Sequence, residues 1–164
     1  MQAMLRGHPV RNGTEKMITL FTVTCYLLDR STKFLVFHYL PLASAVPIVQ
    51  NFFYLVHIHN TGAAFGMFQG KNRPFIILAL VALVAMWQLR VRGTFCTLFR
   101  QYGASLFLAG ILGNLTDRLL YGSVVDIFDF ILPFLGHWPA FNMADAYICI
   151  ATGVCVYSTL FEKK

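Results

Sequence analysis

The sequence predicts an all-α membrane protein with four transmembrane helices and a small β-rich segment outside the membrane. Hydrophobic residues make up 57% of the 164 residues, and charged residues only 12%. Soluble domains carry about twice that share of charge, so a water-soluble fold would expose too much apolar surface. Four apolar segments and one short aromatic, β-branched stretch supply the predicted elements. The length suits one domain, so residues 1–164 are predicted to form a single membrane domain.

The first predicted helix covers residues 17–39. The polar residues 1–16 contain glycine and proline, and we expect them to form an irregular cytoplasmic arm. A cleaved signal peptide is the alternative, because small residues at 43–45 resemble a cleavage site. Three charged residues within 29–33 separate the apolar core from those small residues, whereas cleavage sites normally follow the core closely. A retained helix is therefore preferred.

The other three helices are predicted from long apolar runs at about 74–90, 102–120 and 141–161. The second run begins at Pro74, a residue that suits the first turn of a helix. It is slightly short for a span of about 20 residues, but an arginine next to each end can extend to the membrane surface. The third run contains three glycines, which permit close approach of a neighbouring helix.

Residues at about 48–66, between the first two helices, are predicted to be β-rich. Aromatic and β-branched side chains roughly alternate from Phe52 to His59, which favours a short strand or a strand pair. The tripeptide at 60–62 then predicts a turn. His57 and His59 would project from one strand face and could bind a metal. No third ligand has a suitable spacing, so solvent-facing histidines are the preferred interpretation.

The charge distribution predicts orientation rather than a nucleic-acid site. The net charge is +6, but there is no basic helix face and no dense Lys/Arg cluster with interleaved aromatics. The basic residues gather near the chain ends and in residues 90–100, while 121–140 contain no Lys or Arg. The positive-inside rule then places both termini in the cytoplasm and most of the unusual polar residues at the outer leaflet.

Two aspartates, Asp126 and Asp145, lie in apolar surroundings where a carboxylate is costly, so a function is the default explanation for them. Two carboxyl groups at one site can share a proton and activate water, as in aspartic peptidases. The ionised partner would take a proton from water, and the protonated partner would polarise the scissile carbonyl. Asn114, Asn142 and Arg118 would donate hydrogen bonds to the oxyanion or to substrate carbonyls.

A structural alternative exists for the polar residues of the first and third helices. Asp29 and Lys33 are four residues apart and can form an ion pair, and Asp117 can pair with Arg118 or another neighbouring cation. A structural role and a role at the site remain open for these three residues. The same alternative is weaker for the two candidate catalytic acids, since no spare cation is evident for both. Asp129 has no helical polar partner and is expected to cap an element or face water.

Four sequence blocks together resemble the lipoprotein signal peptidase family, also called signal peptidase II. Single blocks would be weak evidence, but all four occur in the order and at the spacing of the family. The blocks are DRSTK at 29–33, NTGAAFG at 60–66, GILGNLTDR at 110–118 continuing to GSVVD at 122–126, and FNMAD at 141–145.

The resemblance implies an integral-membrane aspartic endopeptidase of the bacterial inner membrane. Such an enzyme removes the signal peptide from prolipoproteins, just before a cysteine that carries diacylglycerol. The implied fold has four helices and a small extracytoplasmic β-cradle. The expected partners are the diacylated prolipoprotein, membrane lipid and a cyclic peptide inhibitor such as globomycin. No metal and no cofactor is implied, and no nucleic acid is expected.

The resemblance also assigns expected roles to individual residues. Asp126 and Asp145 match the catalytic dyad. Asp29, Lys33 and Asp117 are expected to be structural or to organise the site. Residues that match substrate-binding positions or the support of the dyad are Asn60, Gly62, Asn114, Arg118, Asn142 and Ala144.

Two other functions compete with the peptidase. A small proton-coupled carrier could use Asp29, Asp126 and Asp145 as a relay. Carriers usually show inverted repeats and midplane sites, whereas this chain has no repeat and its acids are predicted at the outer side. A non-catalytic membrane subunit with paired charges would lose stability, but no enzymatic activity, when these acids are replaced.

Overall fold

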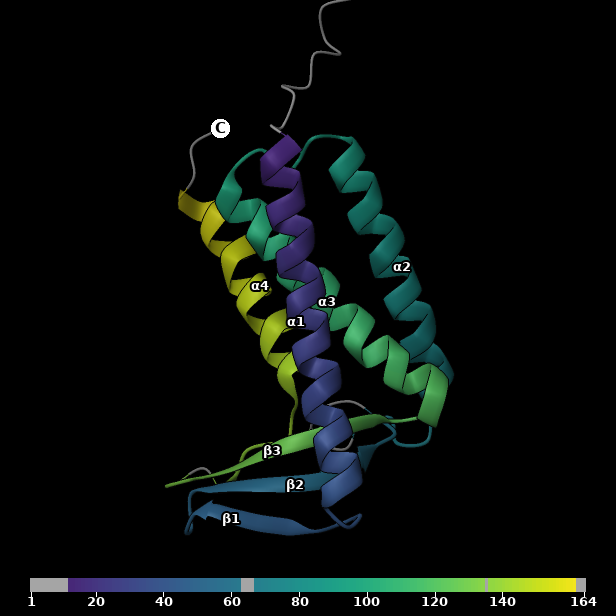
Figure 1. Cartoon of the computed structure of the whole chain (residues 1–164), viewed down its shortest axis with the longest axis vertical. Helices are drawn as coiled ribbons and strands as arrows, with labels where there is room; N and C mark the ends of the chain where they lie inside the picture. Colours follow the sequence, from purple (N-terminus) through teal and green to yellow (C-terminus); the bar gives the residue numbers. More distant parts are fainter. Residues whose placement is uncertain (1–11, 63–66, 135, 162–164) are drawn as a thin grey trace, which may run out of the picture.

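The computed structural model describes residues 12–62, 67–134 and 136–161. These residues form a helix-rich fold in which a small antiparallel sheet closes one end of a helical bundle (Figure 1). The ends of the described chain lie at the opposite end of the bundle (Figure 1). The helices are α1 Asn12–Tyr39, α2 Asn72–Val91, α3 Leu98–Tyr121 and α4 Met143–Phe161.

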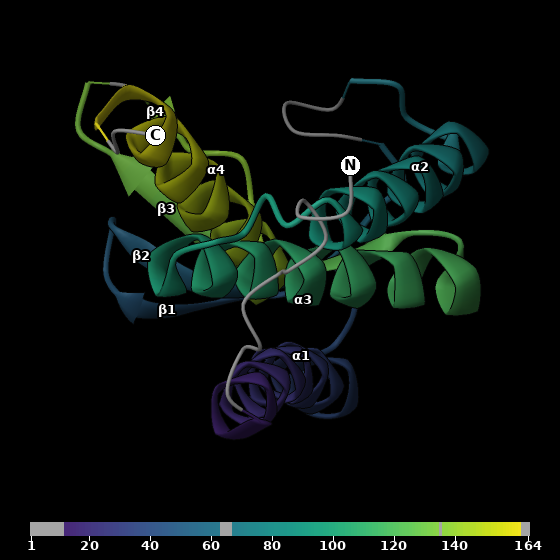
Figure 2. The same ribbon diagram turned by 90° about the horizontal axis from the view of Figure 1, so that it is seen from above.

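Helix α3 is the centre of the bundle. It lies between α1 on one side and α2 and α4 on the other (Figure 2). Glycines on α3 permit this close packing: a Cβ at Gly110 would lie 2.5 Å from the carbonyl oxygen of Ala144, and one at Gly103 would lie 2.5 Å from a methyl of Val154. Both distances are too short for any side chain, so the sequence of α3 sets how closely α4 approaches it.

The sheet has the strand order β1-β2-β3-β4, with antiparallel neighbours. Its central pair aligns Asn60 with Val124 and Ile58 with Asp126. This register places Asp126 beside the end of β2. The strands are β1 Ala45–Val49, β2 Phe53–Asn60, β3 Val124–Leu132 and β4 Gly136–His137.

Several predicted boundaries differ from the structure. Helix α1 already begins at Asn12, so residues 12–16 are helical, although the sequence predicted an irregular arm there. Glu15 lies in the first turn of α1, where a negative charge is favoured by the helix dipole. Residues 1–11 of that arm and residues 63–66 of the predicted β-rich segment lie outside the described residues. The β structure begins at Ala45, before the predicted start at about 48, and includes β3, a strand that was not predicted between the third and fourth helices.

Apolar side chains cover the outside of the bundle. Helix α2 has no buried residue, and its Ile77, Leu78 and Trp87 are each more than half exposed. Among the described helices, α2 and α4 are long and apolar enough to cross a membrane. Helices α1 and α3 carry more polar residues, and Asp29, Lys33 and Asp117 among these are turned into the bundle.

Candidate active site

One asparagine contacts both candidate catalytic carboxyl groups. The side-chain Nδ2 of Asn142 donates to Oδ1 of Asp126 at 3.0 Å, and its backbone N–H donates to Oδ2 of Asp145 at 3.1 Å. Asp126 lies on β3, Asn142 precedes α4, and Asp145 lies in the first turn of α4. The fold therefore brings the two acids into contact with the same residue.

The start of α4 explains how Asp145 is held. The side-chain Oδ1 of Asn142 accepts from the backbone N–H of Asp145 at 3.0 Å, while the Asp145 carboxylate accepts from the backbone N–H of Asn142. This reciprocal arrangement is a capping box, with Asn142 as the N-cap residue. The positive end of the helix dipole also favours a negative charge at this position. Asp145 is thus part of the helix start and part of the candidate site.

A backbone bridge holds β3 against the start of α4. Phe141 accepts hydrogen bonds from Ile127 at 3.0 Å and from Phe128 at 2.8 Å, and its own N–H donates to Phe128 at 3.0 Å. Asp126 and Asn142 directly flank these bridging residues. Their contact is therefore fixed by main-chain hydrogen bonds as well as by their own side chains.

Asp126 is buried, and its second oxygen is held by β2. Nδ2 of Asn60 donates to Oδ2 of Asp126 at 3.0 Å. Burial, together with the neighbouring charge of Asp145, raises the pKa of Asp126 to about 7; the hydrogen bonds from Asn60 and Asn142 oppose this shift. Asp126 can therefore exchange a proton near neutral pH.

A buried lysine, Lys33, is connected to Asp145 through Asn114. Nδ2 of Asn114 donates to Oδ1 of Asp145 at 2.7 Å, and Oδ1 of Asn114 accepts from Nζ of Lys33 at 3.1 Å. Lys33 also forms ion pairs with Asp29 at 3.0 Å and with Asp117 at 2.8 Å. Three acceptors therefore surround an ammonium group that is 1% exposed. Asn114 therefore links the Lys33 ammonium group to the Asp145 carboxylate through two hydrogen bonds.

The two acids that pair with Lys33 also fix the backbone around the site. Oδ1 of Asp29 accepts from the backbone N–H of Ala144 at 3.0 Å, which ties α1 to the start of α4. Oδ2 of Asp117 accepts from the backbone N–H of Val125 at 3.2 Å, which ties α3 to β3. Each bond lies one residue from a candidate catalytic acid.

Arg118 contacts the segment that follows β2. Its Nη2 donates to the carbonyl of Gly62 at 2.8 Å, and its Nη1 donates to Oδ1 of Asn72 at 3.2 Å. Its guanidinium also lies 4.4 Å from the ring centre of Phe75. The backbone N–H of Gly62 donates in turn to Oδ1 of Asn60 at 2.9 Å. Arg118 is therefore connected to Asp126 through Gly62 and Asn60.

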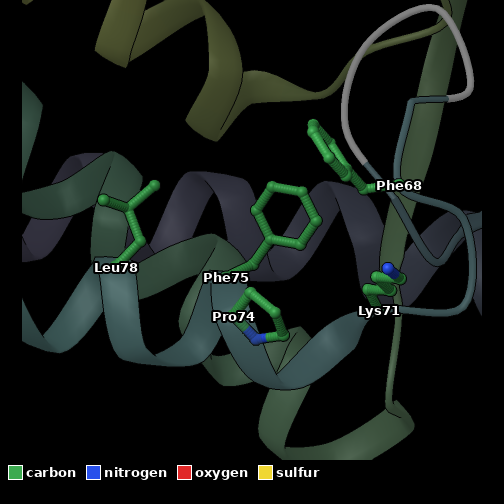
Figure 3. Close-up of a pocket in the computed structure, with 5 residues that line it drawn as sticks. All are labelled: Phe68, Lys71, Pro74, Phe75 and Leu78. Atoms are coloured by element: carbon green, nitrogen blue, oxygen red, sulfur yellow. The ribbon is translucent and has the colours of Figure 1, made fainter.

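The segment around Gly62 leaves no room for a side chain. A Cβ on Gly62 would overlap the carbonyl oxygen of Met67 and lie 3.1 Å from the backbone nitrogen of Gln69. Beside this segment, a mostly apolar pocket of about 160 Å³ opens at the first turns of α2 (Figure 3). It is lined by Phe68, Lys71, Pro74, Phe75 and Leu78.

All eleven residues singled out from the sequence lie in or beside one connected set of contacts. The sequence did not predict the partners of two of them. Asp117 pairs with Arg30 of α1, not with its neighbour Arg118, and Arg118 pairs with Asn72. Adjacent residues on a helix point about 100° apart, so Asp117 and Arg118 face different partners. The sequence did contain an indication of these partners, because Arg30 and Asn72 are polar residues within predicted or adjacent helical segments.

The histidines and Asp129 lie apart from the carboxyl pair. His57 is buried, contrary to the expectation of a solvent-facing residue, because it packs under the end of α1 and bonds the carbonyl of Leu40 at 2.8 Å. Nδ1 of His59 lies 3.0 Å from the hydroxyl of Ser123. Asp129 pairs with the exposed His137 at 3.3 Å. Within the described residues, no three His, Cys, Asp or Glu side chains are placed to hold a metal ion.

Comparison with known proteins identifies the family. The signal peptidase (SPase) II family profile matches residues 21–161. The lipoprotein signal peptidase of Desulforapulum autotrophicum is 40% identical over 161 residues, which cover 92% of this chain and 97% of that protein. The lipoprotein signal peptidase of Clostridioides difficile is 39% identical over 140 residues, which cover 84% and 90% of the two chains.

A solved structure shares the fold. It is described as a bacterial membrane enzyme determined by the in meso method at 2.3 Å resolution, and it is 28% identical to this chain with a TM-score of 0.79. The match covers 91% of this chain and 93% of the solved one. The chain therefore belongs to the signal peptidase II family, and the aspartic-type signal peptidase predicted from its sequence is confirmed.

Proposed function

We propose that this protein removes the signal peptide from diacylglyceryl-modified prolipoproteins and cuts just before the lipidated cysteine. The observation that carries the proposed mechanism is the position of Asn142, which is hydrogen bonded to Asp126 and to Asp145 at once. Two carboxyl groups held at one residue, one of them with a pKa raised to about 7, are suited to sharing a proton.

The two acids take different roles in this mechanism. Asp145 is the base that takes a proton from water, because the start of α4 and Asn114 favour its charged form. Asp126 carries the shared proton and donates it to the carbonyl oxygen of the scissile peptide bond. After water has attacked, Asp145 passes its proton to the leaving nitrogen and the C–N bond breaks. Asp126 regains its proton when the carbonyl of the new carboxyl end re-forms.

The supporting residues hold this pair and its surroundings. Asn60 and Asn142 hold the two oxygens of Asp126, and Asn114 holds Asp145. Arg118 holds the Gly62 carbonyl, and the Gly62 N–H in turn donates to Asn60. These bonds fix the backbone beside which an extended substrate would bind. The buried ion pairs of Lys33 with Asp29 and Asp117 hold the backbone next to the two acids. No metal or cofactor takes part in this proposal.

The proposed setting is the bacterial inner membrane. All four helices cross the bilayer, both termini are cytoplasmic, and the sheet forms an extracytoplasmic β-cradle, by which we mean β1 to β4. The site then lies at the outer leaflet. A lipidated cysteine can keep its acyl chains in the bilayer there while its peptide bond meets water.

Purified protein and a diacylated prolipoprotein test the proposal directly. The wild-type protein should release the signal peptide, and globomycin should block the reaction. Asp126→Asn and Asp145→Asn should each lower turnover at least about a thousandfold while the protein stays folded. Asp129→Asn is the matched control, because Asp129 pairs with His137 away from the dyad. Near-normal turnover by either dyad variant would refute the mechanism, and cleavage of unlipidated substrate at the same rate would refute the substrate class.

A further inference from the structure

A cavity of about 460 Å³ lies at the end of the bundle opposite the candidate active site. It is a partly open cavity lined by α2, α3, α4 and the connection between α2 and α3. Figure 2 shows α2 and α4 on the same side of α3, and all three helices contribute residues to the cavity lining. Its size and its distance from the two acids mark it as a separate site.

The cavity has apolar walls and a polar end. The walls include Met86 and Leu89 of α2 and Phe107 of α3, which suit hydrocarbon. Arg100 and Ser158 line the polar end. Ser158 is 4% exposed, and its hydroxyl has no hydrogen-bond partner among the described residues. A buried hydroxyl without a partner is costly, so a polar group in the cavity would stabilise it.

Positive charge is concentrated at this polar end. Arg100 lies in the first turn of α3, which contains no acidic residue, so its charge adds to the positive end of the helix dipole. Its Nη2 lies 3.4 Å from the carbonyl oxygen of Ser158, which holds the guanidinium at the cavity. Arg92 follows the last residue of the neighbouring helix α2, whose Arg90 pairs with Glu15 of α1 at 3.6 Å. An anion with a long apolar tail would match both parts of the cavity.

We propose that this cavity binds an anionic phospholipid, with an acyl chain between α2 and α3 and the phosphate beside Arg100 and Ser158. With the proposed orientation, this lipid belongs to the cytoplasmic leaflet, where basic pockets between helices bind anionic headgroups. The signal-peptide helix of a substrate is the competing occupant. Signal peptides carry a basic N-terminal region, which Arg92 and Arg100 would repel, so the charge favours the lipid.

Two native cysteines allow a test in the unmodified chain. Cys149 and Cys155 are both exposed on α4, but Cys155 lines the cavity and Cys149 does not. The full-length protein is placed in nanodiscs of phosphatidylcholine with increasing phosphatidylglycerol. Modification of each thiol by N-ethylmaleimide is followed by peptide mass spectrometry. Phosphatidylglycerol should slow modification of Cys155 several-fold and leave Cys149 unchanged, and phosphatidylcholine alone should give no protection.

Variants separate the site from general surface charge. Arg100→Gln should raise the phosphatidylglycerol fraction needed for half-protection about fivefold. Arg92→Gln, which removes an exposed cation at the same end, should not raise it. Arg100→Lys should retain protection, which keeps the test decisive if Arg100→Gln folds poorly. Equal protection by both lipids, or loss of protection in Arg92→Gln alone, would overturn the proposal.

Two further probes distinguish the sources of an anion and the competing occupant. Inorganic phosphate added to phosphatidylcholine nanodiscs should not protect Cys155, and protection by phosphate would reduce the site to a simple anion site. A synthetic signal peptide in phosphatidylcholine should not protect it either, and protection would assign the cavity to the peptide. The labelling requires no peptidase activity, so its outcome is independent of the proposed cleavage reaction.

Discussion

At the residue scale, Asn142 must be an amide because it does two opposite things. Its Oδ1 accepts a hydrogen bond from the N–H of Asp145, while its Nδ2 donates one to the carboxyl group of Asp126. An aspartate could cap the helix equally well but could not donate to Asp126. The capping of α4 and the proposed support of Asp126 can therefore be separated by one substitution.

Asn142→Asp is expected to keep the start of α4 and to lose most activity. The new carboxylate still accepts from the Asp145 N–H, but it replaces a donor to Asp126 with a like charge. We expect kcat/KM to fall at least about tenfold, because the hydrogen bond from residue 142 to Asp126 is lost and a negative charge takes its place. Thermal unfolding should change little. Asn142→Ala loses both roles and should also unfold at a lower temperature. An active Asn142→Asp enzyme would contradict the proposed role.

Asn60 is expected to lower the pH at which Asp126 gives up its proton, a pH that is raised chiefly by burial and by Asp145. The pKa of Asp126 is raised to about 7, so it is protonated below that pH, and activity that needs the proton should fall as the pH rises through about 7. The hydrogen bond from Asn60 lowers this pKa. Asn60→Ala should therefore move the alkaline limb of the kcat/KM profile upward by about one pH unit. A limb that stays in place or moves to lower pH would contradict this assignment.

At the element scale, small residues set the distance between helices that carry the site. A Cβ on Gly113 of α3 would lie 2.5 Å from Oδ2 of Asp29 and 3.1 Å from the Cβ of Ala144. Asp29 is an ion-pair partner of Lys33, and Ala144 directly precedes Asp145 in the sequence. Gly113 therefore allows α1, α3 and α4 to meet immediately behind the candidate catalytic acids.

Gly113→Ala should damage stability and activity together. The added methyl must push α1 and α4 away from α3, and overpacking of this kind costs about 1–3 kcal/mol. Gly153→Ala on α4 is the matched control, because nothing lies within 4 Å of its added Cβ. That change should stabilise the helix by about 0.5–1 kcal/mol. Thermal unfolding in detergent and turnover of lipidated substrate measure the two effects, and equal behaviour of the two variants would contradict the packing argument.

Local patterns in the sequence were sufficient for the features that depend on local chemistry. The apolar run of α2 and the costly acids Asp126 and Asp145 could be identified without coordinates. Strand β3 could not, since it is defined by pairing with β2, more than sixty residues earlier in the chain. The same reason hid the burial of His57, which depends on contacts with the end of α1. Non-local pairing leaves little trace in a short window of sequence.

At the scale of the whole molecule, the polarity is inverted relative to a soluble protein. Lys33, Asp29 and Asp117 are buried in the bundle, while large apolar side chains of α1, α2 and α4 face outward. In water this surface would promote association, whereas in a bilayer it contacts hydrocarbon and the ion pairs stay inside the protein. The polar residues of α1 and α3 are thus compatible with spanning helices because other helices cover them.

Membrane orientation follows from where the basic residues lie relative to the sheet. Arg90, Arg92 and Arg100 lie at the end of the bundle opposite the β-cradle, so the positive-inside rule predicts that the cradle faces outward. Two thiols test this. Cys96 is exposed in the connection between α2 and α3, and Gln50→Cys places a second thiol in the exposed turn between β1 and β2.

A membrane-impermeant maleimide applied to intact spheroplasts should therefore modify the introduced thiol of the Gln50→Cys variant and leave Cys96 unmodified, as read by peptide mass spectrometry. Lysis should make Cys96 reactive as well, which controls for its accessibility. Labelling of Cys96 in intact cells with protection of the introduced thiol would reverse the orientation. It would place the paired acids at the cytoplasmic side, where a lipidated cysteine in the outer leaflet could not reach them.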